Sequence, residues 1–336
     1  MSMTADAHAT RSMVELITGG WRAQAVYTAA KLELPDHIED GLTDAGSLAE
    51  ATGASQEGLH RLLRLLVAIG VLEGSESTGY RNTPMSATLR RGTQSLRDMV
   101  LLHGEEFYAA WGQAHHAITT VSSGFEAAYG EPFYAYLGQQ PDTAKRFQHT
   151  MNAGNMFFHA VPEAVDFGDK RVVDVGGGGG HLLSSILSAS QDAQGVLFDR
   201  EHMIPEAREH LSTTVGLDRV ELVAGDMFDA VPDGGDVYIL CRVLAGWDDD
   251  AVVRVFENCR RALADSSSRV LFIDRLVADE GASMLPALWD LHLLMTNGGR
   301  HRSRDLVVSL LERAGMRVDR EVELPMETTG LLAAPR

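Results

Sequence analysis

The sequence predicts an α/β protein whose second half folds as a doubly wound, mostly parallel sheet. Between residues 171 and 183 a short apolar segment typical of a buried strand runs into five glycines and then into a helical pattern. From there onward, segments typical of strands alternate with helical segments, as a parallel sheet requires. The preceding residues are mostly helical in periodicity. We therefore expect a helical domain over residues 1–165 and a Rossmann-like cofactor domain over residues 166–336.

The glycine-rich turn indicates which cofactor the second domain binds. Five consecutive glycines suit a tight turn and close backbone approach to a ligand, because each would weaken the interior of a helix or strand. The dinucleotide fingerprint G-x-G-x-x-G fails in both frames, since its third position falls on His181 or Leu182. The pattern acid-x-G-x-G-x-G fits through Asp174, Gly176, Gly178 and Gly180. This loop resembles the S-adenosylmethionine (SAM) loop of class I methyltransferases.

Composition limits the partners and the compartment. Acidic residues outnumber Lys and Arg by 47 to 29, which gives a net charge of −18. Such a chain repels nucleic acid and anionic membranes, so we expect neither as a partner. The N-terminus lacks the basic and apolar regions of a signal peptide, and no apolar run is long enough to span a bilayer. With two cysteines and no CxxC motif, we expect a cytoplasmic protein without a metal site.

Along the N-terminal part, residues 1–10 look disordered and residues 13–30 have helical periodicity. Pro35 is expected to open a short helix, and Ser47 with Glu50 forms a capping-box pattern before the next one. A strongly apolar helix over residues 59–70 and a hairpin over residues 70–83 complete a winged-helix pattern. Its few basic residues do not overcome the global charge. We therefore favour a dimerisation and acceptor-lid module over a DNA-binding one.

The remaining elements follow from periodicity. Residues 95–165 are predicted to be mostly helical over 103–116, 133–137 and 143–161, with a loop near Gly124 and Gly130. The predicted strands cover residues 171–175, 195–199, 219–223, 236–241 and 269–274, with a final edge pair over 316–334.

Acidic residues follow successive predicted strands, where a parallel sheet binds its ligands. Asp199 closes the second strand and is placed to accept a ribose hydroxyl. Asp226, Met227 and Phe228 follow the third strand and suit an adenine, with the carboxylate on its amino group and the apolar side chains against its faces. The predicted cofactor-binding set is completed by Arg200, Cys241 and Arg242, which lie at the ends of predicted strands.

These motifs together resemble the small-molecule O-methyltransferases that include the plant caffeate-type and bacterial natural-product enzymes. The shared motifs, in family order, are the 174–180 loop, Phe198-Asp199, Gly225-Asp226-Met227-Phe228, Trp247-Asp248-Asp249 and Gly298-Gly299-Arg300. The resemblance covers nearly the whole chain. It implies a SAM-dependent methyltransferase acting on a small secondary metabolite, a homodimer formed through the N-terminal helices, and an acceptor pocket beside the SAM sheet.

The general base of that family is replaced here. Its catalytic histidine corresponds to Ala245, and the glutamate that would steady it corresponds to His301. The family's other carboxylate corresponds to Asp274. Three explanations stay open. Alignment of the reactants alone can drive O- or C-methylation, a relocated base such as His301, His292 or Glu163 can act, or SAM can serve non-methylating chemistry such as hydroxylation, decarboxylation or a pericyclic reaction.

The acceptor is specified least. By family position its pocket is expected to be lined by apolar and amide side chains, namely those of Met151, Asn155, Trp289, Leu293 and Asn297. Arg300, Arg302 and Arg304 are expected to be surface charges, although a guanidinium also suits an anionic acceptor group.

Overall fold

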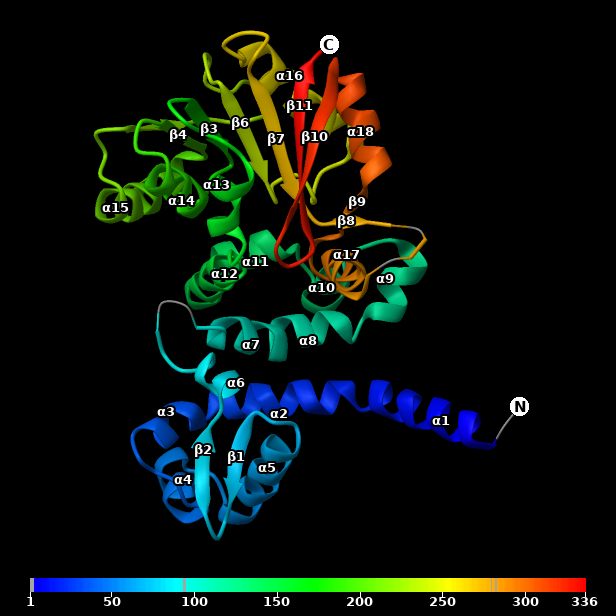
Figure 1. Cartoon of the computed structure of the whole chain (residues 1–336). Coiled ribbons are helices and arrows are strands. Elements are labelled where there is room, and N and C mark those ends of the chain that lie inside the picture. Colours follow the sequence, from blue (N-terminus) through cyan, green and yellow to red (C-terminus); the bar gives the residue numbers. More distant parts are fainter. Residues whose placement is uncertain (1–2, 93–94, 279, 282) are drawn as a thin grey trace. The chain divides into compact units, whose positions relative to one another are not determined.

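A computed structural model describes residues 3–92, 95–278, 280–281 and 283–336 (Figure 1). The chain forms two compact units, one of residues 1–109 and 134–154 and the other of residues 110–133 and 155–336. The expected domain boundary after residue 165 is a separate proposal, because a compact unit of contacts need not coincide with a functional domain. Within the described residues, no helix is long and apolar enough to cross a membrane.

The first unit is helical apart from one hairpin, as the sequence predicts. Its hairpin pairs β1 (Leu72–Ser75) with β2 (Gly79–Asn82) in antiparallel register. Helices α2 to α5 bury an apolar core that includes Leu34, Leu48, Leu63 and Leu66. The helices are α1 (Met3–Ile17), α2 (Gly19–Lys31), α3 (Leu34–Glu39), α4 (Ala45–Thr52), α5 (Gln56–Ala68), α6 (Pro84–Ala87), α7 (Arg97–Gly104), α11 (Phe133–Gln139) and α12 (Pro141–Ala153). Helix α8 (Glu106–Trp111) starts in this unit and ends in the other.

Four local predictions in the N-terminal half are wrong. Residues 3–10 are not disordered but begin α1, whose end carries exposed Leu16 and Ile17. Ser47 does not cap α4, because Asp44 lies at the N-cap and accepts from the Ser47 backbone N–H at 2.9 Å. The single helix expected over 103–116 is divided into α7, α8 and α9 (Ala114–Thr120), and the expected loop at residues 124–130 contains helix α10 (Gly124–Tyr129).

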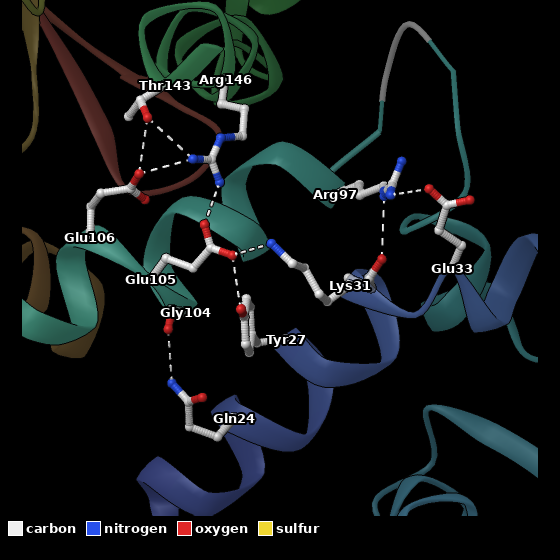
Figure 2. Close-up of polar contacts among 11 residues, drawn as sticks. Gln24, Tyr27, Lys31, Glu33, Arg97, Gly104, Glu105, Glu106, Thr143 and Arg146 are labelled. Atoms are coloured by element: carbon white, nitrogen blue, oxygen red, sulfur yellow. Dashed lines mark hydrogen bonds and ion pairs between the residues drawn. The ribbon is translucent and has the colours of Figure 1, made fainter. Parts of the chain in front are cut away.

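A polar network joins α2, α12 and the junction of α7 with α8 inside the first unit (Figure 2). Glu105 accepts from Tyr27 at 2.8 Å, from Lys31 at 2.6 Å and from Arg146 at 2.7 Å. Partial burial alone would raise the pKa of Glu105, but these three hydrogen bonds outweigh burial and lower its pKa to about 2. Arg146 also donates to the buried Glu106 at 2.9 Å. The network fixes α12, which carries Met151, against α7 and α8.

The second unit is built on a mixed sheet that matches the predicted strands. Within the described residues, seven strands follow the order β10-β11-β7-β6-β3-β4-β5. The strands are β3 (Arg171–Val175), β4 (Gln194–Asp199), β5 (Val220–Ala224), β6 (Val237–Cys241), β7 (Arg269–Asp274), β10 (Met316–Leu324) and β11 (Thr328–Pro335). Strands β3 to β7 are parallel, and the predicted final pair, β10 and β11, is antiparallel. The strand order reverses at β3, which pairs with both β4 and β6, so ligands are expected at its carboxyl end.

Alternate residues of each strand pack on opposite faces of this sheet. Val173, Tyr238 and Phe272 belong to a core with helices α16 (Asp249–Ala262) and α18 (Arg304–Arg313). Their neighbours Val172 and Leu271 belong to a second core with α13 (Val161–Ala164), α14 (His181–Ala189) and α15 (Ile204–Thr214). The sheet is therefore covered on both faces, and its strand ends are left to carry polar groups.

Two short strands place the segment after residue 300 beside the end of β7. Strand β8 (Leu276–Val277) pairs in parallel with β9 (Arg302–Ser303) in the described part of the chain. Helix α17 (Met284–Asn297) connects them along the chain. The pairing of Leu276 with Arg302 brings His301 next to Asp274.

Candidate functional site

The glycine loop after β3 has the backbone that its motif predicts. Gly176, Gly178 and Gly180 have φ angles of 71°, 55° and 76°, a region that side chains disfavour. A Cβ atom at Gly176 would lie 2.5 Å from Val243, whereas one at Gly178 would meet no atom within 4 Å. The turn is therefore packed at Gly176 and open at Gly178, and helix α14 starts directly after it.

The carboxyl group of Asp174 lies under this loop and is 1% exposed. Its Oδ2 atom is buried without a hydrogen-bond partner. Burial and, to a lesser degree, the charge of Asp199 raise the pKa of Asp174 to about 7. A buried carboxyl that lacks a donor is the feature that a cationic ligand would satisfy, so this loop fits the ammonium and sulfonium groups of SAM.

The acids at the ends of the next two strands lie beside the same loop. Asp199 accepts from the Gly178 backbone N–H at 2.7 Å and from its own neighbour Arg200 at 2.6 Å. The side chain of Arg200 forms an ion pair with Asp226 at 3.1 Å. Asp226 also accepts from the Phe228 backbone N–H at 3.0 Å. The three predicted ligand groups Gly178, Asp199 and Asp226 are thus joined, and both carboxylates keep further acceptor capacity for a nucleoside.

Aromatic and sulfur-containing side chains line the remainder of this region. The rings of Phe228 and Trp247 meet edge to face, 4.6 Å apart. Met227 and Phe228 pack against the core on the α16 side of the sheet, and the Asn258 amide holds the Met227 carbonyl at 2.8 Å. Burial raises the pKa of the Cys241 thiol, which keeps it neutral. Met227, Phe228 and Trp247 form an apolar wall that suits an adenine ring better than a phosphate, whereas Cys241 packs against the core on the other face of the sheet.

The loop that contains Ala245 is held by Arg302. This arginine is 5% exposed and donates to the carbonyl oxygens of Leu244, at 3.0 Å, and Trp247, and to Asp249 at 2.9 Å. The backbone N–H of Arg300 donates to the Ala245 carbonyl at 2.9 Å. The expectation of surface charge is wrong for Arg302, although Arg300 and Arg304 are exposed and form ion pairs with acids.

His301 lies beside Asp274, with Nδ1 and Oδ1 3.3 Å apart. The direction between the two atoms is unfavourable for a hydrogen bond, so the Nδ1 atom has no hydrogen-bond partner despite this proximity. The His301 backbone N–H donates to Asp290 at 2.7 Å, and Asp274 accepts from the Arg275 backbone N–H at 2.8 Å. The structure therefore places a histidine and a carboxylate together, as a relocated base would require.

Several predicted acceptor residues lie at the same edge of the sheet. Arg242 has a φ of 56°, and its guanidinium donates to the Asn155 amide oxygen at 3.1 Å. Trp289, Leu293 and Asn297 follow one another at intervals of four on α17 and so share one half-buried face. The Asn297 amide oxygen accepts from the Gly299 backbone N–H at 2.9 Å, which ends the helix.

The remaining predicted residues are His292, whose ring meets that of Trp289 edge to face at 5.3 Å, Glu163 and Met151. His292 is buried, and its Nδ1 accepts from the Trp111 indole at 3.1 Å, so that lone pair is already used. Glu163 is exposed on α13. Met151 belongs to the first compact unit. No group of His, Cys, Asp and Glu in the described residues has the arrangement of a metal site.

No sequence pattern singles out Arg275, which is buried in the structure and directly follows Asp274. An arginine after a strand is ordinarily a surface residue, and only the packing of α17 over it shows otherwise.

Comparison with known proteins identifies the family. A family model for the O-methyltransferase domain matches residues 111–317, and one for the O-methyltransferase dimerisation domain matches residues 14–92. The chain belongs to the O-methyltransferase family. It is similar to phenazine-1-carboxylate N-methyltransferase of Pseudomonas aeruginosa, with 45% identity over 97% of each chain. It is also similar to 3-amino-4-hydroxybenzoate 4-O-methyltransferase of Streptomyces cremeus, with 41% identity over 98% of this chain and 91% of that one.

Solved structures agree with this assignment. The pyocyanin biosynthetic protein PhzM has a TM-score of 0.89 and 44% identity, covering 98% of this chain and all of that one (100%). NcsB1, an O-methyltransferase of neocarzinostatin biosynthesis solved with SAM and 2-hydroxy-5-methyl naphthoic acid, has a TM-score of 0.78 and 29% identity, covering 94% of this chain and 96% of that one. This O-methyltransferase family member is therefore a SAM-dependent methyltransferase of small-molecule acceptors, and nothing in these relatives favours the non-methylating alternative.

Proposed function

We propose that this enzyme methylates a ring nitrogen of a planar aromatic carboxylic acid, with phenazine-1-carboxylate as the representative acceptor. The observation that carries the proposal is the residue at the family's base position, Ala245, in a chain that is 45% identical to a phenazine-1-carboxylate N-methyltransferase. A pyridine-like nitrogen has a free lone pair and no proton, so its methylation needs no general base. A phenol, by contrast, has to lose a proton during the reaction.

The proposed roles of the cofactor-binding residues follow from their contacts. Bound SAM supplies a sulfonium methyl group, which a ring nitrogen attacks with its lone pair, so that the N–C bond forms as the S–C bond breaks and positive charge passes from sulfur to nitrogen. Asp174 compensates the cationic end of the cofactor, and Asp199 accepts from its ribose. Asp226 and Phe228 hold the adenine, and Arg242 binds the methionine carboxylate.

In the proposed reaction, alignment of the acceptor with the methyl group takes the place of catalysis by a general base. Asn155, Trp289, Leu293 and Asn297 orient the flat ring so that its nitrogen lies in line with the methyl group. Alignment of this kind can contribute about 7–11 kcal/mol to lowering a barrier.

A competition between acceptors tests this proposal. Purified enzyme is supplied with SAM and equal concentrations of phenazine-1-carboxylate and 3-amino-4-hydroxybenzoate, and both products are quantified together with S-adenosylhomocysteine. The proposal predicts that the phenazine is consumed preferentially and gives a zwitterionic product, in which the methylated ring nitrogen is permanently cationic and the carboxylate is retained. Preferential formation of the methyl ether of the hydroxybenzoate would reject it.

O-methylation is the second candidate, because one contact favours it. His301 and Asp274 lie 3.3 Å apart in a protein whose usual base is replaced, and such a pair can remove a phenolic proton. In that reaction the proton passes from the acceptor hydroxyl to the imidazole as the O–C bond forms.

We also propose that the protein is a cytoplasmic homodimer formed through residues 13–110. The matched dimerisation domain supports this, as do the large apolar side chains exposed along α1 and α2, namely Met13, Val14, Leu16, Ile17 and Trp21. Sedimentation at micromolar concentration is expected to give twice the chain mass of 36.5 kDa, and Trp21→Glu to give the monomer mass. A monomeric wild-type protein would contradict the proposal.

A further inference from the structure

Arg275 is a buried cation without a counter-ion. It follows Asp274 at the carboxyl end of β7 and is 8% exposed. Its Nε atom is fully buried and has no hydrogen-bond partner. Among the residues that the structure describes, no carboxylate forms an ion pair with its guanidinium, and Asp274 accepts instead from the Arg275 backbone N–H at 2.8 Å. Burying an uncompensated charge is strongly unfavourable, so its presence calls for an anion.

The surroundings of this guanidinium are aromatic. Its central carbon lies 5.3 Å from the centre of the Trp289 ring. The ring of Trp289 in turn meets His292 edge to face at 5.3 Å, and His292 is held by the Trp111 indole. A cation over an aromatic ring is stabilised, but this contact leaves the hydrogen-bond donors of the guanidinium unused. They remain available to a planar group that carries oxygen atoms.

The charges near Arg275 are mixed. Burial is the main cause that lowers the pKa of Arg275, and the positive charge of Arg242 lowers it further. The charges of Asp274 and Glu327 raise this pKa, but by less. Arg242 and Arg275 thus form a pair of cations at the ends of adjacent strands β6 and β7. Two such cations are stable together when anions separate them. Arg242 is the closer of the two to β3, where the glycine loop starts, because the strand order is β7-β6-β3.

We propose that Arg275 binds the carboxylate of the acceptor and so selects carboxylated aromatic substrates. The inference rests on the proposed function above and adds the residue that recognises the carboxylate of the acceptor. The guanidinium can donate two parallel hydrogen bonds to a carboxylate. The Trp289 ring packs against this guanidinium. The acceptor ring then extends along the α17 face that carries Leu293 and Asn297. The cofactor carboxylate stays with Arg242.

The test compares protein variants with matched ligands. Arg275→Gln, Arg275→Lys and wild type are titrated calorimetrically, in the presence of S-adenosylhomocysteine, with phenazine-1-carboxylate, phenazine-1-carboxamide and 1-naphthoate. We expect Arg275→Gln to lower the affinity for both carboxylate ligands roughly 30-fold or more, since it removes one partner of a buried charge pair. The affinity for the carboxamide should change little. Arg275→Lys keeps the charge but not the planar guanidinium, so its carboxylate affinity should lie between those of wild type and Arg275→Gln. Arg313→Gln, which removes an exposed arginine paired with Asp250, is the charge-matched control.

The outcomes separate this inference from the proposed function. Equal losses for the carboxylate and the carboxamide, or a lost affinity for S-adenosylhomocysteine, would overturn the role of Arg275. Should Arg275→Gln unfold early, Arg275→Lys decides, because unchanged carboxylate affinity there rejects bidentate recognition. The 1-naphthoate probe has no ring nitrogen, so Arg275-dependent binding of it supports the inference even if phenazine-1-carboxylate is not methylated. If phenazine-1-carboxylate is methylated equally well by wild type and by the Arg275 variants, the proposed function stands and the role of Arg275 is rejected.

Discussion

The imidazole of His301 lies 3.3 Å from the carboxylate of Asp274, and the two side chains are 7% and 6% exposed. The strand pairing of Leu276 with Arg302 holds them in this position. Such a pair has the composition of a general base, yet its direction is unfavourable for a hydrogen bond. Its role is therefore decided by the chemistry of the acceptor.

His301→Ala separates base catalysis from positioning. For transfer to a ring nitrogen we expect kcat to change little while KM shifts, since the imidazole shapes the site without moving a proton. A base role would instead lower kcat by about 10²–10⁴. Steady-state kinetics with the native acceptor measure the difference, and Asp290→Asn, which alters the residue that holds the His301 backbone, is the positional control.

Ala245→His places a histidine at the position that we propose corresponds to the family's base. We expect it not to raise the native rate tenfold, because the loop is fixed by Arg302 and a new imidazole would intrude on the space of the acceptor. Initial rates with saturating SAM measure this. A large gain in rate would show that the enzyme is an O-methyltransferase that has lost its base, and would contradict a site adapted to a small side chain at this position.

Asp199→Ala tests the nucleoside site. Asp199 accepts from Gly178 at 2.7 Å and is placed for the ribose. Loss of a charge-assisted hydrogen bond should weaken SAM binding by about 1.5–3 kcal/mol. Calorimetric titration gives the affinity, with Asp218→Ala, a change outside the site, for comparison. An unaltered dissociation constant would reject the assignment of Asp199.

SAM binding should depend on pH through Asp174. Burial and the charge of Asp199 raise the pKa of Asp174 to about 7, above its value in the unfolded chain. The protonated carboxyl is thus favoured in the fold below that pH, and a cationic ligand requires it to ionise. We expect SAM affinity to rise roughly tenfold from pH 5.5 to 7. His181 does not interfere, since burial and His210 lower its pKa to about 4.

Asp174→Asn is the matched variant for this pH dependence. It should bind SAM more weakly and with little variation over the same range. The variant should also be more stable than wild type above pH 7, where the wild-type protein holds a buried charge. A wild-type affinity that is flat between pH 5.5 and 7 would contradict the proposed contact between Asp174 and the cofactor.

Glu105→Gln tests the polar network of the first unit. Because its hydrogen bonds lower the pKa of Glu105 to about 2, its stabilising effect is complete above the unfolded value of about 4.5 and is lost as the pH falls toward 2. At pH 7 the variant should lose about 1–3 kcal/mol of unfolding free energy, and this gap should narrow below pH 4.5. Denaturant unfolding at several pH values measures the gap. The exposed Glu57→Gln should change stability little.

The sequence predicted the parts of the site that depend on sheet topology. Asp174, Asp199 and Asp226 each end or follow a strand, and parallel strands gather such ends at one edge. Contacts between distant segments were not predictable in the same way. Nothing local distinguishes the buried Arg302 from the exposed Arg300, because burial comes from the carbonyl groups of a loop over fifty residues away.

The helical errors have a physical origin as well. Residues 3–10 lack an apolar periodicity, so no pattern indicated α1, yet their Ala-rich composition suits a helix once it is extended by the apolar residues 13–17. Glu105 breaks the apolar pattern over 103–116 with a φ of −109° and a ψ of −92°, and its ionic partners come from α2 and α12. A local sequence pattern carries no information about partners of that kind.

The atom that receives the methyl group tests the central claim most directly. The enzyme is incubated with phenazine-1-carboxylate and SAM labelled with ¹³C in its methyl group, and the product is analysed by NMR and mass spectrometry. We predict one labelled methyl carbon bonded to a ring nitrogen, in a zwitterionic product formed one-to-one with S-adenosylhomocysteine. A labelled methyl group on oxygen, whether as an ester or an ether, would contradict nitrogen methylation without a base.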